Sequence, residues 1–310
     1  MSSFTVAVTG GAGYVGSHVC KELARNGYRP VVIDDLSTGH RWAVRWGPLV
    51  VCDIRQQDVL TDVLREYGVR AIVHCAGRTL VGESMRDPGA YFDANVGGSL
   101  SLLNAAVKAN VRYLVFSSSA GVYGHPDQIP IPEHVRPDPQ NPYGESKLLV
   151  ERMIRWFAEV HGLRAVSLRY FNAAGADPDG EVGECHDPET HLIPSILNAL
   201  FDDRPVSVFG CDYPTPDGTA IRDYVHVSDL ATAHVRALQY LDDDEAAAFS
   251  IFNLGSGRGF SVTEVIAEVE QVTGRSVKRV DRPRRPGDPP ILVADITQAV
   301  ASLAWKPTMD

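Results

Sequence analysis

The 310-residue sequence has no hydrophobic run that approaches the length of about 20 residues needed to cross a membrane. Its beginning lacks the basic flank and the cleavage site of a signal peptide. The five cysteines are odd in number and scattered, which argues against a disulfide framework and for reduced thiols. These absences predict a cytoplasmic protein with no membrane partner.

Positive charge is also scarce. The formal net charge is -10 at pH 7, and no basic stripe of the kind that binds nucleic acid is present. Basic residues gather at Arg282, Arg284 and Arg285. An acidic chain with one local arginine group favours a small anionic ligand over a polyanion, while a solvated loop explains the same arginines equally well.

Short β-branched segments alternate with helix-like segments through the first half of the chain. The predicted strands are 5–9, 29–33, 49–52, 71–74, 113–117 and 165–170. The predicted helices are 14–26, 59–67, 91–110 and 143–160. This alternation is typical of an α/β fold with a doubly wound parallel Rossmann sheet.

A glycine-rich turn follows the first predicted strand and opens the first predicted helix. The segment at 10–18 reads G-G-A-G-Y-V-G-S-H. Gly10 allows a tight turn, Gly13 lets the backbone approach a pyrophosphate, and Gly16 lets the helix pack closely on the strand. The free N–H groups of the helix N-terminus would bind the phosphates, so the segment predicts a dinucleotide site.

Acidic residues end the next two predicted strands. Asp34 would accept hydrogen bonds from an adenosine ribose and would repel a 2′-phosphate, which favours NAD over NADP. Asp35 strengthens this preference, and the nearest following cation is Arg41. Asp53 ends the third strand and is predicted to face the adenine.

The second half of the chain is more irregular. Proline- and glycine-rich stretches occur at 125–142, 173–191, 212–220 and 281–290. Loops of this length in a compact protein are usually functional or disordered, and ligands bind beyond the carboxyl ends of parallel strands. We expect a discontinuous arrangement of two domains. The expected ranges are 1–174 plus 226–258 for the NAD-binding domain and 175–225 plus 259–310 for a smaller α/β substrate domain.

A tyrosine and a lysine stand four residues apart at a predicted helix start. The segment at 141–147 reads N-P-Y-G-E-S-K, with Asn141 as the N-cap and Pro142 as the first helical residue. Tyr143 and Lys147 then share one helix face. A phenol titrates near about 10, and a cation about 5 Å away lowers this pKa by roughly two units. An adjacent oxidised nicotinamide, which is also positive, would lower it further, so Tyr143 is predicted to exchange protons near neutral pH.

Three serines end the predicted strand that precedes this helix. Ser119 lies about one βα unit before Tyr143, so both side chains can reach the same sugar hydroxyl. With Asn95, this combination resembles the extended short-chain dehydrogenase/reductase family, and in detail its NAD-dependent epimerase/dehydratase members, over nearly the whole chain. The motifs that carry the resemblance are those already quoted, V-G-E-S (81–84), S-S-S-A-G-V-Y-G (117–124), R-Y-F-N-A-A-G-A (169–176), F-G-C-D-Y-P-T-P-D-G-T-A-I-R-D-Y-V-H-V (209–227) and R-R-P-G-D (284–288).

The resemblance implies a set of site residues. The implied catalytic residues are Ser119, Tyr143 and Lys147. The implied NAD-binding residues are Gly10, Gly13, Tyr14, Val15, Gly16, Asp34, Asp35, Asp53, Ile54, Cys75, Ala76, Gly77, Asn95, Tyr143, Lys147 and Phe171. The implied UDP-sugar-binding residues are Ser119, Asn172, Leu192, Phe209, Arg222, Arg285 and Asp288. A guanidinium fork matches phosphate geometry, which independently fits the two arginines.

The resemblance also implies the reaction. Relatives that dehydrate a nucleotide sugar carry an Asp-Glu pair after the strand-end hydroxyl residue, where this chain has Ala120 and Gly121. Neither residue moves a proton, so a 4-keto intermediate would only take its hydride back. We therefore expect reversible inversion at C4 of a UDP-hexose with tightly bound NAD. The alternatives are a UDP-pentose or UDP-N-acetylhexosamine substrate, a net dehydrogenase, and a catalytically silent NAD-binding scaffold.

Several positions depart from the family pattern. His191 stands where many members have asparagine, and Thr79 where some have lysine. Leu292 aligns with a position thought to select for N-acetylated sugars and is intermediate in size. Cys185, His186 and His191 match no standard zinc spacing, so no metal is predicted. Members also continue into a terminal helix, which implies that this chain is a short or truncated variant, and they pair as homodimers through helices that match 91–110 and 143–160.

Overall fold

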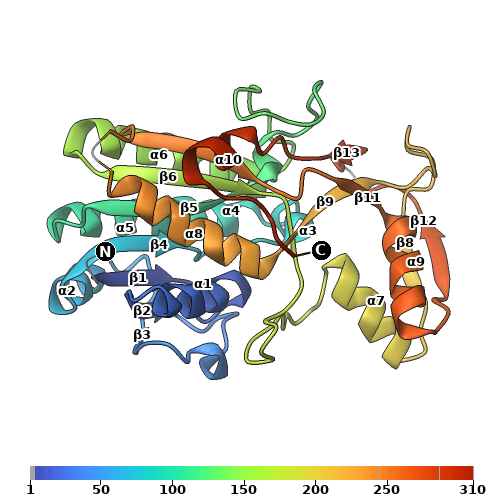
Figure 1. The fold of residues 1–310 in the computed structure, drawn as a ribbon, viewed down its shortest axis with the longest axis horizontal. Helices are drawn as coiled ribbons and strands as arrows, with labels where there is room; N and C mark the ends of the chain where they lie inside the picture. The colour runs from blue at the N-terminus through green and yellow to red at the C-terminus, as the bar shows by residue number, and fades with distance from the viewer. Residues whose placement is uncertain (1–3, 244, 286, 310) are drawn as a thin grey trace.

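A parallel sheet forms the centre of the protein. The computed structural model describes residues 4–243, 245–285 and 287–309, and within these residues seven strands make up this sheet (Figure 1). In spatial order they are β10 (Phe249–Leu254), β6 (Arg164–Tyr170), β5 (Tyr113–Ser119), β4 (Val69–His74), β1 (Thr5–Thr9), β2 (Arg29–Asp34) and β3 (Leu49–Val51). The predicted doubly wound Rossmann sheet is confirmed, and β10 is a strand that the prediction lacked.

Helices cover both faces of this sheet (Figure 1). They are α1 (Tyr14–Arg25), α2 (Gln57–Glu66), α3 (Val81–Ser84), α4 (Pro88–Tyr91), α5 (Gly98–Lys108), α6 (Pro142–His161), α8 (Val227–Leu241) and α10 (Thr297–Leu303). Single turns form at η1 (Arg41–Ala43) and η3 (Ala120–Val122). Among the described helices, none is long and apolar enough to cross a membrane.

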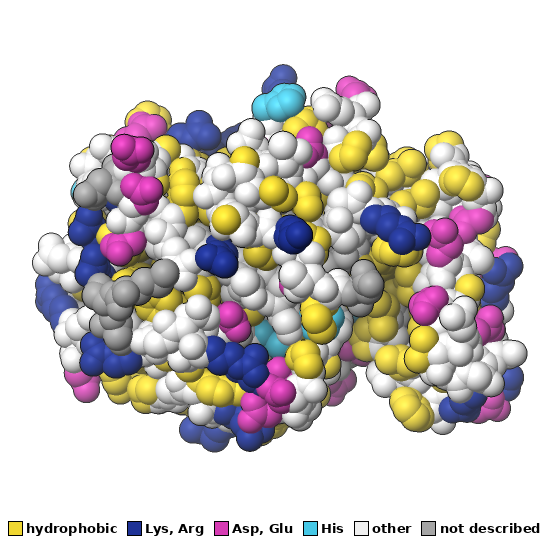
Figure 2. Space-filling model, viewed as in Figure 1, with side chains coloured by type: hydrophobic (Ala, Val, Ile, Leu, Met, Phe, Trp, Pro, Cys, Tyr) yellow, Lys and Arg dark blue, Asp and Glu magenta, His cyan; other side chains and the backbone are white. Residues whose placement is uncertain are grey.

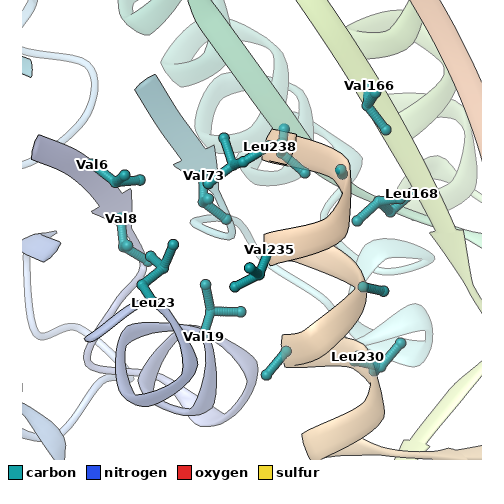
Figure 3. Packing of buried hydrophobic residues seen from close by; sticks show 14 of the residues in the cluster. Val6, Val8, Val19, Leu23, Val73, Val166, Leu168, Leu230, Val235 and Leu238 are labelled. Atoms are coloured by element: carbon teal, nitrogen blue, oxygen red, sulfur yellow. The ribbon is translucent and has the colours of Figure 1, made fainter. Parts of the chain in front are cut away.

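The alternation of side chains along the strands divides the core into two layers. Val6 and Val8 of β1 point to one face, where α1 and α8 pack side by side (Figure 3). Ala7 points to the other face, which is covered by α2, α5 and α6. Because successive side chains of a strand point in opposite directions, a buried central strand is apolar at every position.

The start of α6 follows the prediction. Asn141 Oδ1 accepts a hydrogen bond from the Gly144 N–H at 2.9 Å, and Pro142 occupies the first turn. The helix ends at Gly162, whose φ of 69° is left-handed. The predicted helix at 91–110 is instead interrupted by the π-helical segment η2 (Phe92–Gly97). Such segments are rare and frequently lie at functional sites.

A smaller part of the chain stands beside the carboxyl ends of the large sheet (Figures 1 and 2). Its elements are β7 (Asn172–Ala174), α7 (Leu192–Phe201), β8 (Val206–Phe209), β9 (Ile221–His226), β11 (Gly259–Ser261), α9 (Val262–Thr273), β12 (Arg279–Arg282) and β13 (Ile291–Leu292). Strand β9 pairs with β11, β13 and β7, while β12 pairs with β8. The exact domain boundaries stay a prediction.

Candidate functional site

The glycine turn between β1 and α1 is closely packed by backbone. Gly10 has a φ of 72°, and a Cβ there would lie 2.6 Å from the Ala76 nitrogen. A Cβ on Gly16 would lie 2.1 Å from the Gly10 carbonyl oxygen. Gly13 is the N-cap of α1 and carries no side chain over the helix N-terminus. The turn therefore has the close backbone packing and the uncovered helix N-terminus that a phosphate cradle requires.

The three predicted acidic residues differ in burial and in their hydrogen-bond partners. Asp34 is buried at the end of β2 and accepts hydrogen bonds from the N–H groups of Ala12 and Leu36. Burial raises the pKa of Asp34, against these two hydrogen bonds. Asp35 is exposed and accepts from Ser37, and Asp53 pairs with Arg55. Only Asp34 is thus held rigidly next to the glycine turn.

The residues that follow β4 extend this cradle along the edge of the sheet. Cys75 continues the strand by donating its N–H to the Thr9 carbonyl at 2.9 Å. A Cβ on Gly77 would meet Asn95 Oδ1 at 2.9 Å and Lys147 Nζ at 3.8 Å. Asn95, which lies in η2, bonds both backbone groups of Arg78 and Ser146 Oγ. Gly77 therefore lies between Asn95 and Lys147, with no room for a side chain of its own.

Each of the three serines at the end of β5 has a different partner. Ser117 Oγ contacts Cys75 Sγ and His234 Nε2, and its carbonyl accepts from Lys147 Nζ at 2.9 Å. Ser118 Oγ donates to Glu151 Oε1 at 2.6 Å. Ser119 Oγ accepts from the Gly121 N–H at 3.0 Å. The first two serines hold the strand end and the lysine in place, which leaves Ser119 at the open edge.

Tyr143 and Lys147 meet Ser119 at this edge. Lys147 Nζ lies 5.9 Å from the centre of the Tyr143 ring and is buried. Burial lowers the pKa of Lys147 to about 8, against the attraction of Cys75 and Glu151. A Cβ on Gly121 would lie 3.3 Å from Ser119 Oγ and 3.7 Å from the Tyr143 ring. Ala120 carries only a methyl group and Gly121 has no side chain, so neither residue covers this edge.

The predicted lowering of the Tyr143 pKa is wrong for the chain by itself. Burial raises the pKa of Tyr143, and a hydrogen bond with Ser119 opposes this only in part. The prediction counted the positive charges of Lys147 and of an oxidised nicotinamide, but not the loss of water around the phenol. A further positive charge at the site is needed before Tyr143 can act as a base near neutral pH.

The predicted diphosphate residues come together in the smaller part. Arg222 on β9 is largely buried, with a side chain 13% exposed, and lies 3.9 Å from Asp288. The Arg285 guanidinium stacks 4.1 Å above the Phe209 ring. Burial lowers the pKa of Arg222, and the nearby Arg285 lowers it further. Two guanidinium groups near each other with one nearby carboxylate carry a net positive charge, which favours an anion. Pro286, within the same motif, lies outside the described residues.

The remaining predicted substrate residues border the same region. Asn172 is exposed at the start of β7, and the buried Phe171 precedes it. Leu192 is the first residue of α7 and packs with Tyr224 of β9. Leu292 lies on β13 beside Arg222. Thr79, which departs from the family pattern, is exposed.

The segment between β7 and α7 is tied to the glycine-turn helix. Tyr14 Oη donates to the Gly175 carbonyl at 2.6 Å. Lys21 Nζ bonds Asp177 and Asp179 and lies 2.8 Å from Glu181. A small pocket is lined by residues of both elements and of η1, namely Ala12, Gly13, Tyr14, Thr38, His40, Trp42, Ala43, Gly183, Cys185 and His186. The segment 175–191 therefore closes over the phosphate end of the cradle.

Two buried polar groups that hold the site were missed by the sequence analysis. Arg169 and Glu151 form an ion pair at 2.6 Å behind the serines, with both side chains 3% exposed. His74 bridges Thr9 and Ser99 across the sheet, and burial lowers its pKa to about 3. Glu151 lies four residues after Lys147 on α6, so helix spacing was a signal that would have found it.

These features define a class of protein. A Rossmann sheet, a tightly packed glycine turn beside a buried acid, and a serine–tyrosine–lysine group at the same edge are typical of NAD-dependent enzymes that act on an alcohol. Comparison with known families and structures makes this more specific.

A profile of the NAD dependent epimerase/dehydratase family matches residues 6–255. The UDP-glucose 4-epimerase of Lacticaseibacillus casei is 47% identical over 99% of this chain and 92% of its own length. Among solved structures, UDP-glucose 4-epimerase from Brucella ovis in complex with NAD has a TM-score of 0.95 at 49% identity, covering 99% of this chain and 94% of that one. The Stenotrophomonas maltophila UDP-glucose-4-epimerase, solved with NAD and formylated UDP-arabinopyranose, has a TM-score of 0.95 at 41% identity, covering 99% and 94%.

The chain belongs to the NAD dependent epimerase/dehydratase family, and its similarity to UDP-glucose 4-epimerases extends over its whole described length.

Proposed function

We propose that this protein interconverts UDP-glucose and UDP-galactose by reversible inversion at C4, with NAD as a resident cofactor. The observation that carries the proposal is the group of Ser119, Tyr143 and Lys147 at the same sheet edge as the glycine cradle. The full-length similarity to UDP-glucose 4-epimerases supports it.

The residues fit NAD at both ends of the cradle. The side-chain-free backbone of Gly10 and Gly13 would hold the pyrophosphate, and Asp34 would accept from the adenosine ribose. Lys147 would donate to the nicotinamide ribose past Gly77, where a side chain would collide with Asn95. NAD held there would supply reversible hydride acceptance, and its positively charged ring would add to the charge of Lys147.

Tyr143 is the proposed acid–base residue. It takes the proton of the sugar 4-hydroxyl as the 4-keto sugar forms, and it gives the proton back when the alcohol forms again. The combined positive charge offsets the burial that raises its pKa in the chain alone. Ser119 hydrogen-bonds the same oxygen and holds it in line with the phenol.

The diphosphate is the proposed anchor about which the keto sugar turns. Arg222 and Arg285 would each bind phosphate oxygens, and Phe209 and Leu192 would flank the uracil. Asp288 would accept from the uridine ribose, and Asn172 would contact the diphosphate. Because the anchor lies on the smaller part and the chemistry on the large sheet, the sugar can present either face of C4 without leaving.

The absence of an acid pair after Ser119 separates epimerisation from dehydration. Ala120 and Gly121 occupy the turn η3, where neither side chain carries a proton. A keto sugar bound there has no group to remove a proton from C5 and expel water. The predicted products therefore keep all their oxygen atoms, and no NADH accumulates.

The test is turnover of the purified holoenzyme with a panel of UDP-glucose, UDP-galactose, UDP-xylose and UDP-N-acetylglucosamine. Interconversion of the first two without net NADH release supports the proposal. A preference for UDP-xylose or UDP-N-acetylglucosamine would favour the UDP-pentose or the UDP-N-acetylhexosamine alternative instead. Loss of water from the sugar, or stoichiometric NADH, would overturn it.

We also propose a homodimer, a cytoplasmic location and a place in galactose metabolism. Support for the dimer comes from apolar side chains that α5 and α6 expose, among them Leu100, Trp156 and Val160. Support for the location comes from the five cysteines, all of which are free thiols.

A further inference from the structure

Four potential metal ligands converge in the segment before α7. Glu184, His186, Glu189 and His191 each turn one donor atom inward, and these atoms all lie within 4.8 Å of one another. The set falls within eight consecutive residues, in a spacing that matches no standard zinc pattern. The fold of the segment, rather than the spacing, brings the donors together.

The contacts inside the group resemble ligands around a common centre. Glu184 Oε1 lies 3.1 Å from His186 Nδ1 and also faces His191 Nδ1. Glu189 Oε2 lies 3.8 Å from His186 Nδ1, which is too long for a hydrogen bond. Ligands of a tetrahedral ion with bonds of about 2.0–2.1 Å are about 3.3 Å apart. The two separations from His186 lie on either side of this value, while Glu184 and His191 stand closer together than two ligands of one ion.

Two of the donor atoms lack a hydrogen bond although they are shielded from water. The Glu184 side chain is 9% exposed, and its Oε1 has no hydrogen-bond partner of acceptable geometry. The same holds for His191 Nδ1. Glu184 Oε1 faces only the two imidazole nitrogens, and neither contact has the geometry of a hydrogen bond, so a cation between these donors would stabilise the segment.

The second carboxylate is already oriented toward the group. Glu189 Oε1 accepts from the N–H groups of Thr190 and His191 at 2.7 and 2.8 Å. Its other oxygen, Oε2, is thereby left facing His186. Two carboxylates and two neutral imidazoles carry a charge of -2, which a divalent cation balances.

A neighbouring acidic group shows the contrast. Asp177, Asp179 and Glu181 also gather their oxygens within 4.8 Å. Their carboxylate oxygens, however, surround Lys21 Nζ at 2.6 to 2.8 Å. This ammonium group already occupies the centre that a cation would take, so the second group needs no metal.

We propose that Glu184, His186, Glu189 and His191 bind a divalent transition cation in a tetrahedral site, with Zn²⁺ as the best match. Imidazole and carboxylate donors suit Zn²⁺, and four protein ligands leave no open position, which is the arrangement of a structural site. The ion would fix the segment that closes over the phosphate end of the cradle and leads into Leu192 of α7. This role is separate from the proposed reaction.

The test uses untagged holoenzyme loaded with Zn²⁺, desalted and analysed for metal by mass spectrometry. We expect about one tightly held zinc per chain, and a large loss of it in Glu184→Gln and in His191→Asn. Glu181→Gln is the matched control in the same segment and should keep the metal. Equal zinc contents in wild type and Glu184→Gln would overturn the proposal.

Two measurements on the wild type stand even if a variant fails to fold. After removal of metal by a chelator, added Zn²⁺ should raise the midpoint of thermal unfolding, because an ion that binds only the folded state stabilises it. Added Co²⁺ should give the strong visible absorption of a tetrahedral nitrogen and oxygen site. No rise in midpoint and no such absorption would each count as evidence against a metal, and both together would refute it.

Discussion

At the scale of single residues, the phenol of Tyr143 carries the proposed chemistry. Tyr143→Phe removes the proton-transfer group and keeps the ring, so kcat should fall by about 10²–10⁴-fold. Bound NAD should remain, since the cradle is unchanged, and its absorbance can be read on the purified protein. Tyr67→Phe, at the far end of α2, is the control and should keep full activity. Unchanged turnover in Tyr143→Phe would assign the acid–base role elsewhere.

Lys147 offers a prediction about pH. Burial lowers its pKa from 10.5 to about 8 in the folded chain. Between these two pH values the unfolded chain binds more protons than the folded one, so stability rises with pH in this window. Below pH 8 the cost of burying the ammonium group is present in full.

The measurement compares the wild type with Lys147→Met, both without cofactor, by urea unfolding from pH 7 to pH 10.5. The variant should gain relative stability at the lower pH, and the wild type should recover it as the pH rises. Other titrating groups cancel in this difference. A difference that does not change with pH would show that the folded-state pKa of Lys147 is not lowered.

At the scale of elements, the contact between α1 and β1 depends on one missing side chain. Gly16→Ala would place a Cβ 2.1 Å from the Gly10 carbonyl oxygen, which forces the helix away from the turn. We expect destabilisation of about 1–3 kcal/mol and weaker retention of NAD. Gly82→Ala is the matched control, because a Cβ there meets nothing within 4 Å.

Thermal unfolding and the ratio of bound NAD to protein check this prediction together. Gly82→Ala should match the wild type in both. If Gly16→Ala also matched the wild type, close packing at the turn would not be what holds the cofactor.

Elements with strong local signals were predictable from the sequence. The start of α6 has a capping side chain and a proline that act within one turn, and both work as expected. The π-helical segment η2 was not predictable, because its apolar spacing still reads as a continuous helix. Strand β10 was missed because Ile251 is its one β-branched residue and its pairing partner, β6, is distant in the sequence.

Some features of the candidate site were likewise predictable from the sequence, and others were not. The glycine turn and Asp34 end consecutive strands of one βαβ unit, and the structure places them in contact through the Ala12 N–H. The raised pKa of Tyr143 was not predicted, because the burial that raises it is a property of the whole fold. The convergence of Glu184 with His186 and His191 also depends on how a loop folds back on itself, which periodicity does not reveal.

At the scale of the whole molecule, the protein is built so that cofactor and substrate anchors come from different parts. The large sheet supplies the glycine turn and the Tyr143 edge, while β9 and the segment after β12 supply Arg222 and Arg285, and β8 supplies Phe209. Figure 2 shows this smaller part as a distinct lobe beside the larger one. The segment 175–191 links the two and is tied to α1 by Lys21.

The proposed dimer can be tested through the exposed apolar surface of α5 and α6. Trp156 and Val160 are 65% and 68% exposed on α6, and Leu100 of the adjacent α5 is 43% exposed. Because large apolar side chains gathered on one surface mark association sites, Trp156→Glu should convert a dimer into a monomer, as read by sedimentation equilibrium. Phe201→Glu is the control, since Phe201 is 78% exposed on α7 in the smaller part. A wild type that sediments as a monomer, or a Trp156→Glu variant that stays dimeric, would show that these helices do not form the interface.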